Sequence, residues 1–192
     1  MSGGGPLRFS CTCGKVSGHM DEPALRGGFR ISCHCPDCRA ADRHLRGTSG
    51  RIDPIDIYQT SPDHVHIDSG ADHLGLFRLG PKGLFRWYAT CCGTPLFNTL
   101  ASARLPFVGV LTENFETPDR LGPVRGQSFV PGPGGKPRNS GSGAMAWGII
   151  SRMLTARLSG RWRQTPFFDT ESGKPRAEAQ ILSREQRAEL YD

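Results

Sequence analysis

The 192-residue sequence contains no apolar run long enough to cross a bilayer, and its first residues lack the charged and apolar segments of a secretory signal. The first absence argues against a membrane-spanning protein. The second, together with an odd total of seven cysteines, argues against a framework of disulfides. With 36% hydrophobic and 22% charged residues, the chain does not have the composition of a disordered polyelectrolyte. We therefore expect one compact domain with an appendage, located in the reducing cytoplasm.

Cysteine is absent from the basic part of the chain. Residues 1–117 hold all seven cysteines, and their 12 Lys and Arg nearly balance 11 Asp and Glu. Residues 118–192 have 12 basic and 7 acidic residues, which gives this part +5 of the total formal charge of +6. Cysteine chemistry and positive charge therefore belong to different pieces of the molecule.

Short apolar or alternating runs, separated by turn residues, fill the chain between Leu7 and Asn114. Separating segments such as Gly-Pro-Lys-Gly at 80–83 favour turns, because proline presets one backbone angle and glycine permits positive φ. This spacing predicts a mainly β domain over residues 1–117. The expected strands are residues 7–10, 28–32, 55–59, 64–68, 74–79, 84–89, 95–99 and 106–111.

Residues 118–143 contain seven glycines and five prolines among 26 residues. This composition combines high backbone entropy with few apolar groups, so it predicts a loop or linker. The basic segment that follows, residues 144–192, is expected to form a helical appendage to the β domain.

An amphipathic helix is predicted in this appendage, because Trp147, Ile150, Leu154 and Leu158 recur at helical spacing. We favour a helix packed on the β domain or on a second copy over one that lies on a membrane. Further on, Phe167 and Phe168 are expected to pin an extended segment to the core. A capping box of Ser183 and Gln186 predicts a short terminal helix.

The cysteines form three tight clusters beside turn residues. A zinc site needs sulfurs less than about 4 Å apart, and residues separated by one or two positions in a turn achieve this. Scattered buried thiols would not cluster in this way, so metal binding is the better interpretation. The clusters are Cys11 and Cys13, then Cys33, Cys35 and Cys38, then Cys91 and Cys92.

Seven thiolates can form one closed site of four sulfurs and one site of three sulfurs with an open position. Cys33, Cys35 and Cys38 are close in sequence and can hold an ion unaided, so we assign the open, reactive site to them. Cys11 and Cys13 need a distant partner, which Cys92 supplies. We therefore expect two zinc ions, one structural and one reactive.

The order C-x-C-G, C-H-C-x-x-C-R and C-G-T-P-L resembles the glutathione-dependent formaldehyde-activating enzyme (GFA) family, which includes centromere protein V, over residues 7–112. The resemblance implies a zinc-bound β-tent fold of small stacked sheets. It also implies a structural zinc on the first and last clusters, and a second zinc on the central cluster that binds the glutathione thiol.

The last cluster departs from the family pattern, because Ala89 stands where the earlier cysteine of C-x-x-C is expected and Cys91 appears instead. Adjacent strand residues point to opposite faces, so Cys91 and Cys92 can share one ion only if the chain turns sharply. We favour Cys91 as the replacement ligand of the structural zinc. The rival placement closes the central site with Cys91 and removes its open position.

A zinc ion with three thiolates activates water poorly but still binds a soft thiol. The bound thiolate adds to an aldehyde carbonyl, which agrees with the carbon–sulfur lyase activity implied by the resemblance, the formation of S-hydroxymethylglutathione. The negative charge at this site requires nearby cations, and Arg30, Arg39 and Arg43 are the candidates to bind the ligand.

Histidines supply two further candidates. His34 lies between two ligands and can relay the proton of the incoming thiol, or it can be an ordinary structural group. His64, His66 and Asp68 alternate on one strand face and can hold a metal, although a solvated polar face explains the same pattern.

Two non-catalytic functions compete with the lyase. One is a thiol carrier that binds glutathione reversibly without turnover. The other is a zinc-stabilised module that binds protein or nucleic acid, with its nucleic-acid contact in residues 152–163. We favour nucleic acid less, because the cysteine-bearing half is nearly neutral and 20 of the 24 basic residues are Arg.

Overall fold

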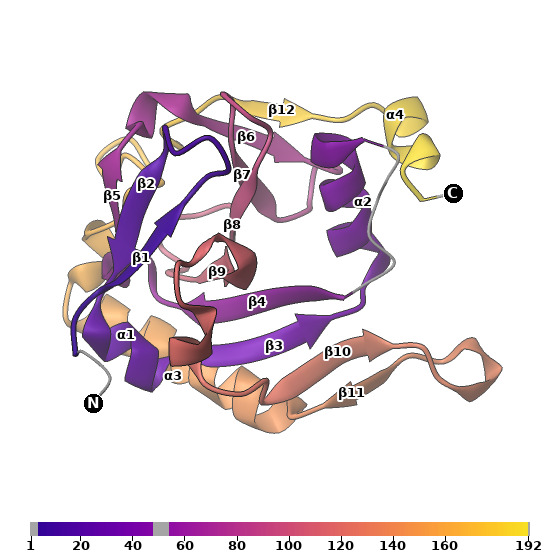
Figure 1. Ribbon diagram of the computed structural model, residues 1–192, viewed down its shortest axis with the longest axis horizontal. Coiled ribbons are helices and arrows are strands. Elements are labelled where there is room, and N and C mark those ends of the chain that lie inside the picture. Colours follow the sequence, from indigo (N-terminus) through magenta and orange to yellow (C-terminus); the bar gives the residue numbers. More distant parts are fainter. Residues whose placement is uncertain (1–3, 48–53, 192) are drawn as a thin grey trace.

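The computed structural model describes residues 4–47 and 54–191, and this part of the chain is mainly β, with two sheets and few helices (Figure 1). The helices are α1 (Glu22–Gly27), α2 (Pro36–Arg46), α3 (Ser142–Leu158) and α4 (Arg184–Glu189). The strands are β1 (Leu7–Ser10), β2 (Ser17–Met20), β3 (Phe29–Cys33), β4 (Ile55–Thr60), β5 (Val65–Ser69), β6 (Leu74–Arg78), β7 (Phe85–Ala89), β8 (Pro95–Thr99), β9 (Val108–Leu111), β10 (Gly126–Val130), β11 (Arg138–Ser140) and β12 (Ala179–Ile181).

The smaller sheet has the strand order β1-β2-β5, and both of its pairings are antiparallel. The larger sheet has the order β11-β10-β3-β4-β9-β8-β7-β6-β12. Its central pairings are antiparallel, whereas β10 runs parallel to β3 and β12 runs parallel to β6. The mainly β class expected from the spacing of apolar runs is confirmed.

Each of the eight predicted runs contains a strand. In β3 the side chains of Phe29, Ile31 and Cys33 are buried while Arg30 and Ser32 are half-buried, which is the alternation of a strand with one covered face. This alternation places Cys33 on the same face as Ile31.

Aromatic side chains from β1, β7 and β8 form the centre of the main core. Trp87 and Phe97 are 1% exposed, and their rings lie 5.2 Å and 5.1 Å from the ring of Phe167. Phe168 stacks on Phe85 with the ring centroids 6.0 Å apart. The expectation that Phe167 and Phe168 pin their segment to the core is confirmed.

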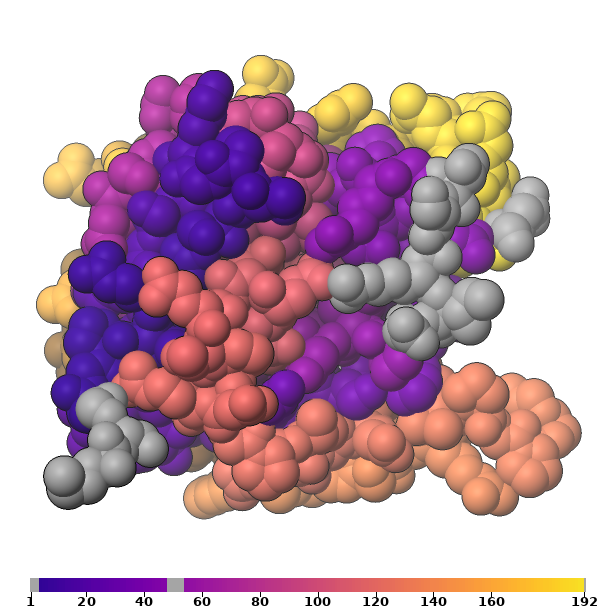
Figure 2. All heavy atoms as spheres, viewed as in Figure 1, coloured from indigo at the N-terminus to yellow at the C-terminus, as the bar shows by residue number. Residues whose placement is uncertain are grey.

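Composition predicts a loop or linker for residues 118–143, but β10 and β11 form an antiparallel hairpin there. Hydrogen bonding to β3 offsets the entropy cost of ordering a segment rich in glycine and proline. The hairpin protrudes from the body of the molecule in both views (Figures 1 and 2). Two strands within residues 118–143, β10 and β11, are therefore part of the larger sheet.

Helix α3 forms where the apolar spacing predicts a helix, but its apolar stripe faces outward. Trp147 is 72% exposed and Leu158 is 80% exposed, while Ala156 is buried. On its covered side, Met145 packs against the apolar cluster of β3 and β4. The helix thus packs on the sheet through Met145, which is not one of the residues of the predicted apolar stripe.

The C-terminal residues complete one edge of the larger sheet, because β12 pairs with β6 and α4 follows directly. Ser183 Oγ accepts from the backbone N–H of Gln186, and Gln186 Oε1 accepts from that of Ser183. This is the predicted capping box. Among the described residues, no helix has the length and apolar character needed to span a membrane.

Candidate metal centres

The three-cysteine group (Cys33, Cys35 and Cys38) lies where β3 ends and α2 begins. Cys33 is the last residue of β3, and Cys35 caps the N-terminus of α2 by accepting a hydrogen bond of 3.3 Å from the backbone N–H of Cys38. Pro36 occupies the first helical position, which suits the fixed φ of proline. This strand-to-helix turn brings the three sulfurs within 4.8 Å of one another, with Cys33 and Cys35 Sγ 3.4 Å apart.

All three sulfurs line a cavity of about 390 Å³. This size is typical of small-molecule sites. The remaining lining comes from β3, β4, the neighbourhood of β7 to β9, the β10–β11 hairpin and α3, and it is mostly apolar. These residues are Ile31, Pro36, Asp37, Ile57, Gln59, Leu84, Arg86, Asn98, Phe107, Gly109, Ser128, Phe129 and Met145.

Arg86 on β7 supplies a buried positive charge to this group. Its side chain is 7% exposed, and Nη1 donates to Cys38 Sγ at 3.6 Å and to Asn98 Oδ1 at 3.0 Å. Hydrogen bonds from the Cys33 and Cys35 thiols hold the pKa of Cys38 well below its usual range, and the charge of Arg86 lowers it further. Cys38 is therefore the thiol of this group that ionises most readily.

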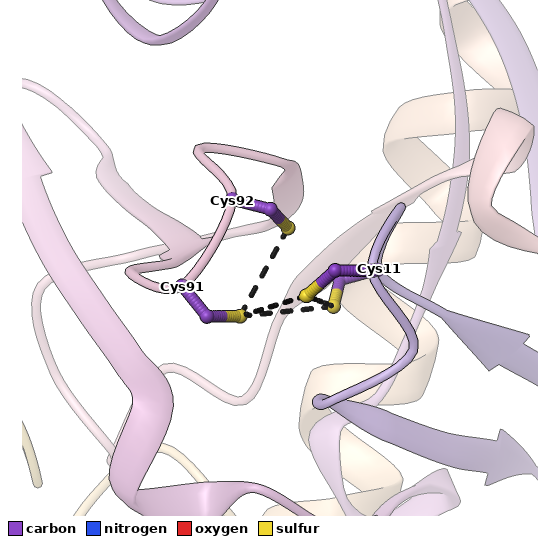
Figure 3. A group of neighbouring side chains, drawn as sticks. Cys11, Cys91 and Cys92 are labelled. Atoms are coloured by element: carbon purple, nitrogen blue, oxygen red, sulfur yellow. Dashed lines mark hydrogen bonds between the residues drawn. The ribbon is translucent and has the colours of Figure 1, made fainter.

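The four-cysteine group (Cys11, Cys13, Cys91 and Cys92) joins two loops that are about 80 positions apart in sequence. Cys91 Sγ lies 3.9 Å from Cys11 Sγ, 3.3 Å from Cys13 Sγ and 3.9 Å from Cys92 Sγ. Figure 3 shows the side chains of Cys11, Cys91 and Cys92 converging from these loops. Cys13 and Cys92 are exposed, so the group lies at the surface.

A sharp turn lets the adjacent residues Cys91 and Cys92 point their sulfurs to one place. The backbone N–H of Gly93 donates to Ala89 O at 2.8 Å, and Gly93 has a φ of 70°, which favours glycine. The structure thus places Cys91 beside Cys11 and Cys13, away from the three-cysteine group.

Threonines fasten the two loops of the four-cysteine group together. Thr12 Oγ1 and Thr94 Oγ1 are 2.7 Å apart, and the backbone N–H of Thr12 also donates to Thr94 Oγ1 at 3.1 Å. Partial desolvation raises the pKa of Cys92, but hydrogen bonds with Thr94 and from the backbone of Cys13 outweigh it and lower that pKa to about 6. Desolvation and the neighbouring thiols raise the pKa of Cys91 to about 12.

Both groups have a spacing that suits a metal ion. Four sulfurs about 2.3 Å from a tetrahedral zinc ion lie roughly 3.8 Å apart. Four sulfur–sulfur separations in the four-cysteine group run from 3.3 to 3.9 Å, and Cys33 Sγ and Cys35 Sγ are 3.4 Å apart. Each group can therefore hold a metal ion through thiolate ligands.

The other predicted site residues lie outside the cavity lining. Arg30 is on the opposite face of β3 from Cys33, and its Nη2 pairs with Asp56 Oδ2 at 2.7 Å. Arg43 donates to Leu190 O at 3.0 Å, Arg39 is half-buried on α2, and His34 Nε2 lies 3.4 Å from Ser32 Oγ. The roles given to these four side chains therefore remain predictions.

A third group, His19, Asp21 and His66, lies on the smaller sheet and can hold a metal. The His19 and His66 rings stack at 4.7 Å across the β2–β5 pair, and His66 Nε2 lies 3.1 Å from Asp21 Oδ2. Of the histidine candidates from the sequence, His64 also approaches Asp21, at 3.5 Å, whereas Asp68 pairs with His19. These ion pairs are half-buried or exposed.

Sequence reasoning missed three residues of the cavity. Arg86 shares a strand face with Leu84, and Gln59 shares one with Ile55 and Ile57. A polar residue on an otherwise apolar strand face is a signal that the sequence offers. Phe129 gives no such signal, because the composition of its segment predicts a linker.

Comparisons with known proteins place the chain in one family. No curated protein matches it. A Rhodobacter sphaeroides protein solved as a structural-genomics target is similar, with 18% identity, a TM-score of 0.42, and coverage of 61% of this chain and 96% of that chain. Residues 1–180 match a family described as of unknown function, DUF6151. Because the match spans most of its length, the chain belongs to the DUF6151 family.

Proposed function

We propose that this protein holds two zinc ions, one in each cysteine group, and binds a thiol at the three-cysteine group to form or cleave an S-hydroxyalkyl adduct with an aldehyde. One observation carries the proposal: the three sulfurs line the 390 Å³ cavity, so a ligand can reach them. The four-cysteine group has a full tetrahedral set of its own and acts as the structural site.

The chemistry follows from the donor set. Zinc held by three thiolates supplies one further position for a soft ligand and favours the thiolate form of a bound thiol. Zinc is preferred over harder cations because every donor is sulfur. The proposed addition of the thiol to the aldehyde changes no oxidation state.

Carbon–sulfur bond formation balances as follows. The sulfur lone pair of the thiolate forms a bond to the carbonyl carbon, the π pair of the carbonyl moves to oxygen, and that oxygen takes up the proton that the thiol released. The reverse reaction breaks the carbon–sulfur bond and returns the proton to sulfur. His34 is the predicted carrier of this proton.

Arg86 is the residue that balances the charge of the sulfurs in this proposal. Three thiolates on one divalent ion leave a net charge of −1, and a bound thiolate makes it −2. The guanidinium of Arg86, 3.6 Å from Cys38 Sγ and buried, offsets part of this charge at low dielectric. Asn98 keeps the guanidinium in position through its hydrogen bond to Nη1.

The test measures zinc per chain and then the thiol-dependent consumption of formaldehyde, with glutathione as the first thiol. We expect two zinc ions and a rate above the spontaneous reaction. Cys35→Ser is the matched variant, because serine keeps the helix cap while removing a sulfur ligand. Two zinc ions with equal rates for wild type and Cys35→Ser would leave only a thiol carrier or binding module, and one zinc per chain would overturn the division of the cysteines.

A further inference from the structure

The cavity beside the three-cysteine group is built for an apolar ligand. Ile31 and Ile57 come from adjacent strands, Leu84 and Phe107 face them across the cavity, and Met145 comes from α3. Ile31 and Ile57 are also buried in one apolar cluster with Cys33 and Cys38. A ligand that reaches the sulfurs therefore has apolar side chains around most of its length.

A polar atom in this wall has no partner among the residues that the structure describes. Gln59 is 6% exposed; its Nε2 lies 3.7 Å from Met145 Sδ, and its Oε1 accepts no hydrogen bond from residues 4–47 or 54–191. A buried carbonyl oxygen without a donor costs free energy, so such atoms are usually satisfied in the functional state. Because Gln59 lines the cavity, a ligand N–H or O–H can satisfy it.

The charges of the lining disfavour a polyanion. Within the described part of the chain, Arg86 and Asp37 are the charged residues of this lining, and Arg86 is already engaged with Cys38 and Asn98. Asp37 adds negative charge at the opening, where its Oδ1 accepts from Tyr191 Oη. Glutathione brings two carboxylates and one ammonium group, and among the described residues this lining has no free cation for the carboxylates.

Phe129, which lines the cavity, has an unusual backbone conformation. Phe129 has a φ of 59°, and among the described residues other than glycine it alone has a positive value. The pairing of β10 with β11 shifts register between Gln127 and Val130, as a bulge does. Bulges and strained aromatic residues occur where a side chain is redirected toward a site. Here the redirected residue adds an apolar wall to the cavity.

We infer that the thiol bound at the three-cysteine group has an apolar body with one hydrogen-bond donor, that Gln59 accepts this donor, and that glutathione binds less tightly than such a thiol. The inference rests on the proposed function, which it deepens by naming the class of thiol. The register of β3 and β4 places Gln59 opposite Phe29, four residues along β3 from Cys33, which is about 13 Å. The anilide of 6-mercaptohexanoic acid belongs to this class, because its chain separates the N–H from the sulfur and both its chain and its ring are apolar.

The experiment is titration calorimetry on the full chain loaded with zinc. The probes are the anilide of 6-mercaptohexanoic acid, glutathione and 2-phenylethanethiol, which lacks the amide donor. We expect the anilide to bind at least about tenfold more tightly than either of the others, the typical effect of one buried hydrogen bond. Glutathione that binds as tightly as the anilide overturns the inference.

Variants of Gln59 identify the acceptor. Gln59→Leu keeps the size of the side chain and should weaken anilide binding about tenfold without weakening 2-phenylethanethiol. Gln127→Leu, an exposed glutamine on β10, is the matched control and should change neither. If Gln59→Leu lowers the unfolding midpoint, Gln59→Glu gives a second test, because a carboxylate still accepts the N–H. Equal losses for both thiols in Gln59→Leu overturn the assignment of Gln59.

The S-methyl ether of the anilide separates the inference from the proposed function, because it fits the cavity but cannot form a thiolate. If the ether binds as tightly as the thiol, the proposal that a thiol binds at the metal is wrong, and the inference of an apolar binding site in the cavity is kept. If glutathione binds but neither the anilide nor the ether does, the inference is wrong and the proposed function is kept. Failure of all probes sinks both.

Discussion

The four-cysteine group lies at the surface with Cys13 and Cys92 exposed, whereas Cys33 and Cys38 of the three-cysteine group are buried. The exposed group brings four sulfurs together, and the buried group brings three together beside a cavity. Under the proposed function, burial therefore does not tell the structural metal site from the reactive one. The number of sulfurs and the space beside them make that distinction.

The two groups also differ in how they are assembled. The three-cysteine group comes from one strand-to-helix turn, residues 33–38, and the four-cysteine group closes a contact between residues 11–13 and 91–92. An unfolded chain keeps the first set of ligands close together but separates the second. Metal at the four-cysteine group should therefore contribute more to stability.

The largest expected effect tests this difference directly. Cys91→Ser should lower the free energy of unfolding of the zinc-loaded protein by about 4 kcal/mol or more, because it opens the site that joins distant loops. Cys35→Ser should cost under about 2 kcal/mol, since serine still caps α2 and the unfolded chain also binds metal at residues 33–38. Urea denaturation with zinc analysis measures both.

Each of these two variants should contain one zinc fewer than the wild type. A larger loss of stability for Cys35→Ser than for Cys91→Ser would reverse the roles of the two groups. A two-zinc Cys91→Ser protein with wild-type stability would show that Cys91 is no ligand.

The second prediction concerns Arg86, the buried cation that donates to Cys38 Sγ in the three-cysteine group. Arg86→Met should weaken zinc binding at the three-cysteine group by roughly 10- to 100-fold, the usual effect of losing an outer partner of a metal ligand. Competition with a chromophoric chelator measures it, and the four-cysteine group should keep its affinity. Arg39→Met is the matched control. If Arg39→Met weakens zinc binding as much as Arg86→Met does, Arg86 is not the residue that specifically balances the charge of the sulfurs.

The third prediction compares thiol reactivity in metal-free protein. With its pKa lowered to about 6, Cys92 is roughly nine-tenths thiolate at pH 7, whereas hydrogen bonds with Cys35 and Cys38, together with burial, raise the pKa of Cys33. Iodoacetamide should label Cys92 well before Cys33. Because thiolate is lost as pH falls through the pKa, labelling of Cys92 should slow about tenfold between pH 7 and pH 5. Peptide mass spectrometry follows both sites, and faster labelling of Cys33 would contradict it.

The strands were predictable because local alternation and turn residues determine them. In β3, the alternation of Phe29, Ile31 and Cys33 with polar residues is visible in the sequence alone. Strand β2 has only four residues, three of them polar or glycine, so it exists through its pairing with β1 and β5. Helix α2 begins at Pro36, inside the segment whose cysteine spacing predicts a metal-binding turn, and that turn hides the start of the helix.

The cysteine clusters were predictable for the same local reason, and the favoured placement of Cys91 beside Cys11 and Cys13 is the one that the structure has. That placement depends on the turn at Gly93 and on the contact between Thr12 and Thr94, which joins loops 82 positions apart. The cavity was less accessible to sequence reasoning, because its wall includes a hairpin and a helix from residues 118–158. Only packing of these elements on β3 and β4 reveals that Gln59 faces a cavity.

The smallest expected effect concerns backbone conformation. Beside the four-cysteine group, Gly93 has a positive φ, whereas in the lining of the cavity a residue other than glycine, Phe129, has one. Phe129→Gly relieves a conformation that costs an ordinary residue about 1–2 kcal/mol, while added entropy of the unfolded chain offsets part of the gain. The free energy of unfolding should therefore stay level or rise by up to about 1 kcal/mol, and binding of an apolar thiol should weaken a few-fold. Val130→Gly, at an ordinary strand position, should destabilise by about 1 kcal/mol. Equal destabilisation of both variants in urea would show that Phe129 carries no strain.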